Sequence, residues 1–88
     1  MTIDLSNINS PQELHLKLKT AFNFNDNYRM NWDSFILSLE KQSDSLPDSI
    51  SIINWKKFSN NFPSEAELLK ERISEFNRNS LESEIEIN

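Results

Sequence analysis

Three short segments with the apolar pattern of β-strands are spread along this chain of 88 residues, and helix-type patterns separate them. Residues 2–5 (TIDL) alternate, with Ile3 and Leu5 on one face. Residues 50–54 (ISIIN) are almost wholly apolar, which predicts a strand buried on both faces, and residues 82–87 (ESEIEI) are typical of an edge strand protected by charge. Strands joined through helices can lie parallel. The sequence therefore predicts an α/β fold, a small three-stranded, mostly parallel sheet packed with about four helices.

Two helices are predicted between the first two strands. The first covers roughly residues 11–23, and its start combines an N-cap, a proline at the first helical position and a capping-box glutamate, which are Ser10, Pro11 and Glu13. Its apolar stripe consists of Leu14, Leu18, Ala21 and Phe22. The second helix covers about residues 31–43, and the stripe that we expect to face the core consists of Trp32, Phe35, Ile36 and Leu39.

Two more helices are predicted between the second and third strands. Residues 55–62 place aromatic side chains three and four apart, which predicts a short helix. Ser64, followed by Glu67, predicts the capped start of a long helix with the stripe Ala66, Leu69, Ile73 and Phe76. Because the chain has no glycine, we expect asparagine to provide turns and positive φ angles, in residues 23–27 and at the end of the last helix, at Asn77 and Asn79.

The composition indicates one small globular domain over residues 1–88, with 36% apolar and 26% charged residues. The first ten residues lack the pattern of a signal peptide, no apolar run is long enough to span a membrane, and cysteine is absent. We therefore expect a cytoplasmic protein that is a monomer when free. The net charge of −5 disfavours direct binding to nucleic acid and suits a basic partner, although charge alone is explained as well by solubility.

No pattern of catalytic or metal-binding residues stands out. His15 is the only histidine, and with no evident orienting partner a structural or surface role is favoured over acid–base chemistry. The glutamates at 65 and 67 fit a helix start, and those at 82–86 fit the exposed face of a strand. A chain without glycine cannot form the usual phosphate-binding loop. We therefore expect neither enzymatic activity nor a cofactor.

The second predicted helix offers a candidate binding surface. Asp33, Leu37, Glu40 and Asp44 are spaced i, i+4, i+7 and i+11, so they share one flank of that helix. Leu37 is the apolar member of an otherwise acidic row and is predicted to be exposed. A single exposed leucine needs no explanation, but beside charged neighbours it can form the apolar centre of a binding patch with a charged rim.

These residues resemble the barstar family, small intracellular inhibitors of a secreted bacterial ribonuclease. The family pattern around its inhibitory helix, Tyr-Gly-x-Asn-x-Asp, is matched by Tyr28, Asn31 and Asp33. Further matches, in the same order along the chain, are the ELH segment (residues 13–15), Pro47 before the middle strand, and the WKKF segment (residues 55–58). The resemblance covers nearly the whole chain, and its specificity comes from the order and spacing of these short motifs together.

The resemblance implies an inhibitor that plugs the active site of a nuclease with the second helix and the loop before it. Acidic side chains imitate the phosphates of the substrate in this family. The tyrosine of the motif carries over to Tyr28, its first acidic contact to Asp33, and a glutamate of the last long helix to Glu75.

The sequence also departs from the family pattern. Arg29 replaces the glycine after the tyrosine, and Leu37 replaces the second aspartate of the inhibitory helix. Ile36 replaces a tryptophan, and a glycine–tryptophan pair at the end of that helix becomes Lys41 and Gln42. The resemblance therefore implies a retained scaffold with a rewritten inhibitory surface, and a target that differs from the usual ribonuclease.

We therefore expect a bacterial immunity protein that neutralises a protein toxin, with a ribonuclease as the expected class, in a one-to-one complex. The expected contact residues are Tyr28, Arg29, Asn31, Asp33, Leu37, Glu40 and Glu75. Asn31 is equally explained as the N-cap of the second helix, and Asp33 as a residue that stabilises its first turn. The alternative function is a structural or regulatory interaction module on the same scaffold, without a nuclease partner.

Overall fold

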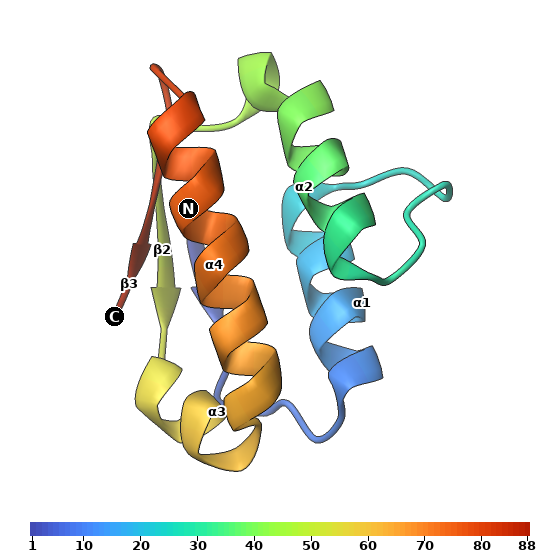
Figure 1. The fold of residues 1–88 in the computed structure, drawn as a ribbon, viewed down its shortest axis with the longest axis vertical. Helices are drawn as coiled ribbons and strands as arrows, with labels where there is room; N and C mark the ends of the chain where they lie inside the picture. Colours follow the sequence, from blue (N-terminus) through green and yellow to red (C-terminus); the bar gives the residue numbers. More distant parts are fainter.

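Helices separate the three strands along the chain in the computed structural model, which describes residues 1–88 (Figure 1). The strands are β1 (Thr2–Asp4), β2 (Ser49–Ile53) and β3 (Glu84–Ile87). The helices are α1 (Pro11–Phe22), α2 (Trp32–Lys41), α3 (Trp55–Asn61) and α4 (Pro63–Asn79), and a short 3₁₀ helix, η1 (Ser43–Ser45), follows α2. The predicted order of elements is confirmed, but α2 ends at Lys41 and not at Ser43, so Asp44 lies in η1.

The three strands form one sheet in the order β1–β2–β3, and both pairings are parallel. Ile3 lies opposite Ile52, and Ile50 opposite Ile85, so these four isoleucines point to the same face. The predicted sheet is thus confirmed and is wholly parallel. β3 is an edge strand, as predicted, and its glutamates are exposed while Ile85 is buried.

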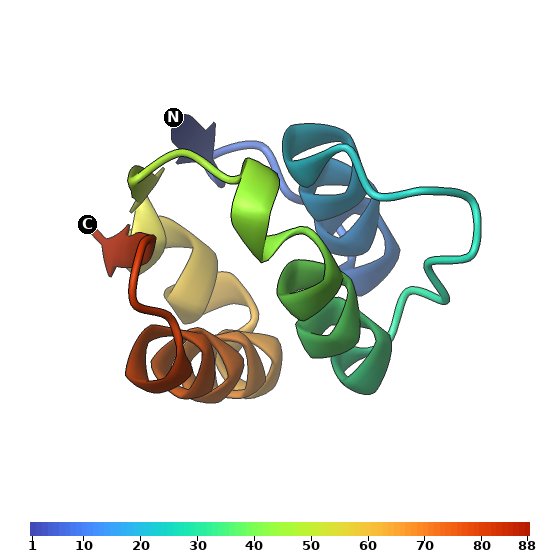
Figure 2. The same ribbon diagram turned by 90° about the horizontal axis from the view of Figure 1, so that it is seen from above.

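The helices cover only one face of this sheet. Viewed from above, α1, α2 and α4 all lie on the same side of the strands (Figure 2). The prediction that β2 is buried on both faces is therefore wrong: Ile50 and Ile52 are fully buried under the helices, whereas Ser51 and Ile53 on the other face are half-buried. The sequence of β2 is apolar enough for two covered faces, but the chain has no helix left to cover the second one.

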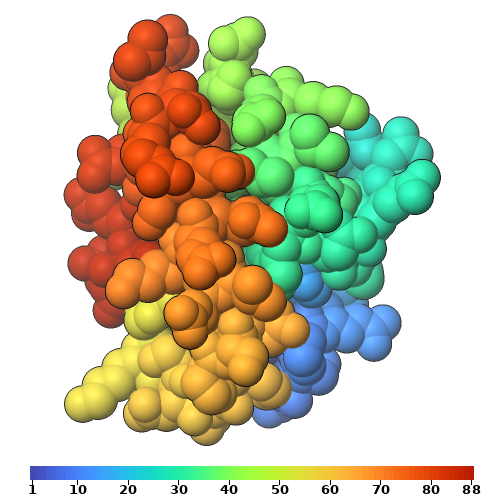
Figure 3. Space-filling model, viewed as in Figure 1, coloured from blue at the N-terminus to red at the C-terminus, as the bar shows by residue number.

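The core lies between the sheet and the helical layer and contains 18 buried apolar residues. The predicted stripes supply most of the helical contribution, which includes Leu14, Leu18, Phe22, Phe35, Ile36, Leu39, Ala66, Leu69, Ile73 and Phe76. Ala21 and Trp32, also predicted as stripe residues, are partly buried against this cluster. Side chains of α2 and α4 adjoin each other on the face of the molecule that Figure 3 shows. No helix is both long and apolar enough to cross a membrane.

Asparagine takes the role of the missing glycine at two of the three positions with positive φ. Asn23 (φ 57°) ends α1, as predicted for residues 23–27, and Asn54 (φ 62°) precedes α3. The third position is Met30 (φ 55°). The prediction for Asn77 and Asn79 is wrong, because both lie within α4.

The start of α4 also differs from its prediction. Ser64 does not cap the helix: Phe62 is the N-cap residue, without a capping side chain, and Pro63 occupies the first helical position. Proline has no N–H that needs a partner, and its fixed φ suits this position. By contrast, Ser10 caps α1 as predicted, since its Oγ accepts a hydrogen bond from the backbone N–H of Glu13 at 3.1 Å.

Candidate functional site

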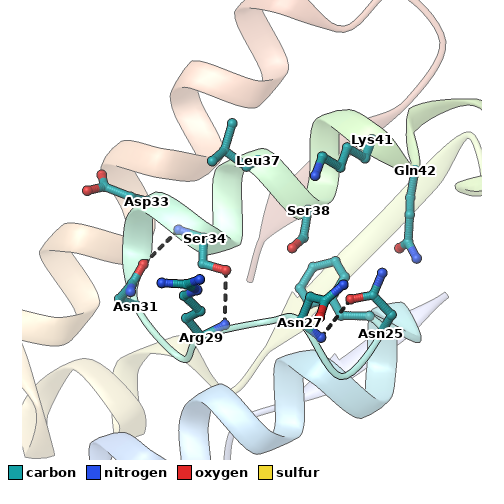
Figure 4. Close-up of a pocket in the computed structure, with 11 residues that line it drawn as sticks. Asn25, Asn27, Arg29, Asn31, Asp33, Ser34, Leu37, Ser38, Lys41 and Gln42 are labelled. Atoms are coloured by element: carbon teal, nitrogen blue, oxygen red, sulfur yellow. Dashed lines mark hydrogen bonds between the residues drawn. The ribbon is translucent and has the colours of Figure 1, made fainter.

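A polar groove lies between α2 and the segment that joins α1 to it, residues 23–31 (the 23–31 loop). Its volume is about 470 Å³, and two of its eleven lining residues are hydrophobic (Figure 4). The lining residues are Phe24, Asn25, Asn27, Arg29 and Asn31 from the loop, and Asp33, Ser34, Leu37, Ser38, Lys41 and Gln42 from α2 and its C-cap. We call this hollow the loop–α2 groove.

The 23–31 loop is held against the start of α2 by side-chain hydrogen bonds. Asn31 caps α2, because its Oδ1 accepts a bond from the backbone N–H of Ser34 at 2.7 Å. The Ser34 hydroxyl in turn accepts a bond from the backbone N–H of Arg29 at 3.0 Å. Earlier in the loop, Asn25 Oδ1 accepts from the backbone N–H of Asn27 at 2.9 Å, which closes an Asx-turn. The loop conformation is therefore specified by its own polar side chains.

Tyr28 anchors the same loop to α1. Its side chain is only 6% exposed, and its hydroxyl lies 2.6 Å from Nδ1 of His15 in α1. Burial lowers the pKa of His15, although nearby Glu65 opposes this, and burial raises the pKa of Tyr28. Both residues are therefore neutral near pH 7, and one hydrogen bond joins the Tyr28 hydroxyl to the imidazole. The structure thus gives His15 a structural role and leaves little of Tyr28 for contact with a partner.

Trp32 continues this buried connection towards α4. Its ring lies 4.6 Å from that of His15, measured between centroids, and its Nε1–H donates to Glu65 Oε2 at 2.9 Å. Trp32 is partly buried against the core, in agreement with its predicted assignment. Through His15, Tyr28, Trp32 and Glu65, the loop, α1, α2 and α4 are fixed relative to one another.

The other predicted contact residues divide into three groups. Arg29, Asn31, Asp33 and Leu37 all line the loop–α2 groove. Glu40 is exposed on α2 but does not line the groove. Glu75 is half-buried on α4 and lines a separate shallow hollow, together with other charged residues of that helix.

Leu37 is the exposed large apolar residue of α2, with an exposed fraction of 54%. Asp33, one turn earlier, lies 3.5 Å from Arg72 of α4, measured from Oδ1 to Nη2. The Asp33 side chain is 91% exposed, so this ion pair is screened by solvent and contributes little to stability. The surface therefore places a leucine beside a carboxylate that remains accessible.

Comparison with protein families decides the identity of this scaffold. The family model described as Barstar (barnase inhibitor) matches residues 1–88, the full length of the chain. The chain belongs to the barstar family. It is thus a barnase-inhibitor-like protein, and its family binds a ribonuclease. A comparison with curated proteins found no match.

Several groove residues of this barstar-family chain were not among the predicted contacts. They are Phe24, Asn25, Asn27, Ser34, Ser38, Lys41 and Gln42. The helical positions carry a signal that finds them, since Ser34, Ser38 and Lys41 are spaced i, i+4 and i+7 and so share a face of α2. The loop positions carry none, because their place in the groove depends on how the loop folds back.

The charges of the groove differ in sign from those of the whole chain. The chain has a net charge of −5, yet the groove is lined by two basic residues, Arg29 and Lys41, and by one acidic residue, Asp33. By the resemblance described above, Arg29 and Lys41 stand where the family pattern has glycine. By that resemblance the two replacements add two cations to this surface.

Proposed function

We propose that this barstar-family protein binds and neutralises a cognate toxin, a ribonuclease, in a one-to-one complex through α2 and the 23–31 loop. The family match over the full chain is the observation that carries this proposal. We further propose that it acts in the cytoplasm as an immunity protein that is a monomer when free. An inhibitor there protects the cell that produces the toxin.

The structure supports this choice of surface through its preorganisation. Five hydrogen bonds fix the loop and the start of α2, namely those of Asn25, Tyr28, Arg29 and Asn31 with their partners and that of Trp32 with Glu65. A surface ordered before binding does not lose that conformational entropy on association. Rigid display of a few side chains is what a tight inhibitor needs.

Within this surface Leu37 would form the apolar centre of the contact. Interfaces gain most of their binding energy from a few central residues that lose contact with water, and a polar rim surrounds them. Asp33 and Glu40, exposed on the same helix, supply a charged rim, and Asn31 and Arg29 border it on the loop side. Tyr28 acts chiefly by holding the loop, and Glu75 extends the contact onto α4.

The departures from the family pattern bear on which ribonuclease is bound. An aspartate in the inhibitory helix can accept hydrogen bonds from basic groups of a nuclease active site, whereas Leu37 cannot. Specificity is a difference between affinities, and changes of charge at an interface are a direct way to alter it. We therefore propose a target whose surface opposite Leu37 is apolar.

The direct test begins with capture of the partner from the native cell on the immobilised protein and its identification by mass spectrometry. The purified partner is then assayed for cleavage of a fluorogenic RNA during titration with the inhibitor. We expect activity to fall linearly to zero at one equivalent. A captured partner that does not cleave RNA, or that cleaves it equally well in the complex, would contradict the proposal and favour an interaction module without a nuclease target.

A further inference from the structure

Arg29 and Lys41 face the loop–α2 groove without a carboxylate to neutralise them. The structure contains two ion pairs, Lys19–Asp26 and Arg72–Asp33, and neither includes these two residues. The guanidinium group of Arg29 lies between the loop and α2, within the hollow (Figure 4). Two unpaired cations thus share one groove of an acidic protein.

Asp33, the one acidic residue of the lining, does not offset these charges from within the groove. It lies in the first turn of α2, and its carboxylate contacts Arg72 of α4. Figure 4 shows this carboxylate directed away from the hollow. The Asp33 carboxylate therefore lies on the side of α2 that meets α4, in a solvent-screened ion pair with another cation.

The remaining polar lining offers further hydrogen-bond donors. Asn25 Oδ1 is occupied by the backbone N–H of Asn27, which leaves the Asn25 NH₂ group to donate. Asn27 and Ser38 add a second amide and a hydroxyl. Arginine offers five N–H donors in a planar fork that fits a carboxylate, and lysine offers three. The lining thus suits an acceptor that carries negative charge.

We infer that the loop–α2 groove binds a carboxylate of the partner, an aspartate or glutamate side chain on a protruding segment, between Arg29 and Lys41. The inference rests on the proposed function for the existence of a protein partner. It assigns this part of the interface a charge relationship opposite to that of an inhibitor that imitates phosphates: here the inhibitor supplies the cations. A polyanion such as RNA is disfavoured, because the net charge of the chain is −5 and a long phosphate backbone would meet that charge.

The test uses defined probes in place of the unidentified partner. The ¹⁵N-labelled protein is titrated at low ionic strength with the capped peptide acetyl-Gly-Glu-Glu-Gly-amide, and amide chemical shifts are recorded. We expect saturable shifts in residues 25–31 and 38–42 with the glutamate peptide, and none with the matched acetyl-Gly-Gln-Gln-Gly-amide. Salt at 1 M, where the Debye length is about 3 Å, should abolish the binding.

Substitutions locate the effect within the groove. Arg29→Gln and Lys41→Gln should each weaken peptide binding by about tenfold, the factor that corresponds to loss of one charge-assisted hydrogen bond. Lys57→Gln removes an exposed lysine of α3, outside the groove, and should leave the affinity unchanged. All three replace exposed side chains, so the fold is expected to persist, and the amide spectrum of each variant verifies this.

Three results would overturn the inference. They are equal shifts with the glutamine peptide, equal weakening by Lys57→Gln, and no saturable shift in the groove at all. A uridine hexanucleotide that produces the same shifts, with the same dependence on Arg29 and Lys41, would reassign the groove to nucleic acid. These measurements require no toxin, so a negative peptide result does not bear on whether the protein inhibits RNA cleavage. Likewise, absence of that inhibition does not change the peptide result.

Discussion

Replacement of Tyr28 by phenylalanine removes one hydroxyl from beneath the 23–31 loop and changes nothing else in size or shape. The ring keeps its contact with Phe24, whose centroid lies 5.0 Å away, so the apolar contribution to stability is preserved. The loss falls on His15, which is 6% exposed and whose Nδ1 would be left without its partner at 2.6 Å. A buried polar group without a hydrogen bond costs about 1–3 kcal/mol, and we expect the free energy of unfolding to fall by that amount.

Urea denaturation followed by tryptophan fluorescence and circular dichroism measures this change. The midpoint should fall while the slope of free energy against urea stays constant, because the surface exposed on unfolding is unchanged. In thermal scans, each 1 kcal/mol corresponds to a decrease in Tm of about 4–8 °C for a domain of this size. In a His15→Phe background, Tyr28→Phe should cost much less, since the two residues act as one pair. A change of less than about 0.5 kcal/mol, typical of surface substitutions, would refute the anchoring role of this bond.

Three further predictions follow from contacts elsewhere. Burial lowers the His15 pKa below its ordinary value of 6.5, so the unfolded chain binds a proton that the folded chain excludes. The free energy of unfolding should therefore decrease as the pH falls below about 6.5. Urea denaturation at a series of pH values measures this dependence, and His15→Phe should remove it. Asn77→Ala removes two hydrogen bonds of 2.9 Å, to the backbone N–H and C=O of Ile85. We expect the free energy of unfolding to fall by about 1–3 kcal/mol and hydrogen exchange at the Ile85 amide to accelerate. The control Asn79→Ala, at an exposed residue, should do neither. Asn31→Ala removes the N-cap of α2 and should cost about 0.5–2 kcal/mol in the same urea assay, most of which Asn31→Ser should recover.

The sequence predicts the elements of this fold because periodicity is a local property. The spacing of Leu14 and Leu18, or of Leu69 and Ile73, is sufficient to place a buried stripe on a helix, and the structure confirms these stripes. Details that depend on the neighbouring element are less accessible. Asn77 is a residue type that is common at helix ends, but α4 continues past it to Asn79. Its side chain instead forms hydrogen bonds with the β3 backbone at Ile85.

The candidate site shows the same division. The capping role of Asn31 can be predicted from the sequence, since an N-cap bond spans only three residues. The burial of Tyr28 is not, because it depends on His15, which is 13 positions away in another helix. The spacing of Lys41 places it on one face of α2 with Ser34 and Ser38, but it does not place that face beside the loop. Their contribution to one groove with Arg29 emerges only when the loop folds back on α2.

The central claim, that α2 and the loop before it bind the partner, is tested most directly by one pair of matched variants. Leu37→Asp places a charge on α2, at a side chain that is 54% exposed, and Leu16→Asp makes the same change on α1, at one that is 43% exposed. The dissociation constant of each variant for the captured toxin is measured by calorimetry, and equal Tm values verify that the fold is intact. We predict that Leu37→Asp weakens binding by about 30-fold or more, as for a central contact of about 2 kcal/mol, and that Leu16→Asp changes it less than about twofold. Equal affinities of the two variants would show that the partner binds elsewhere.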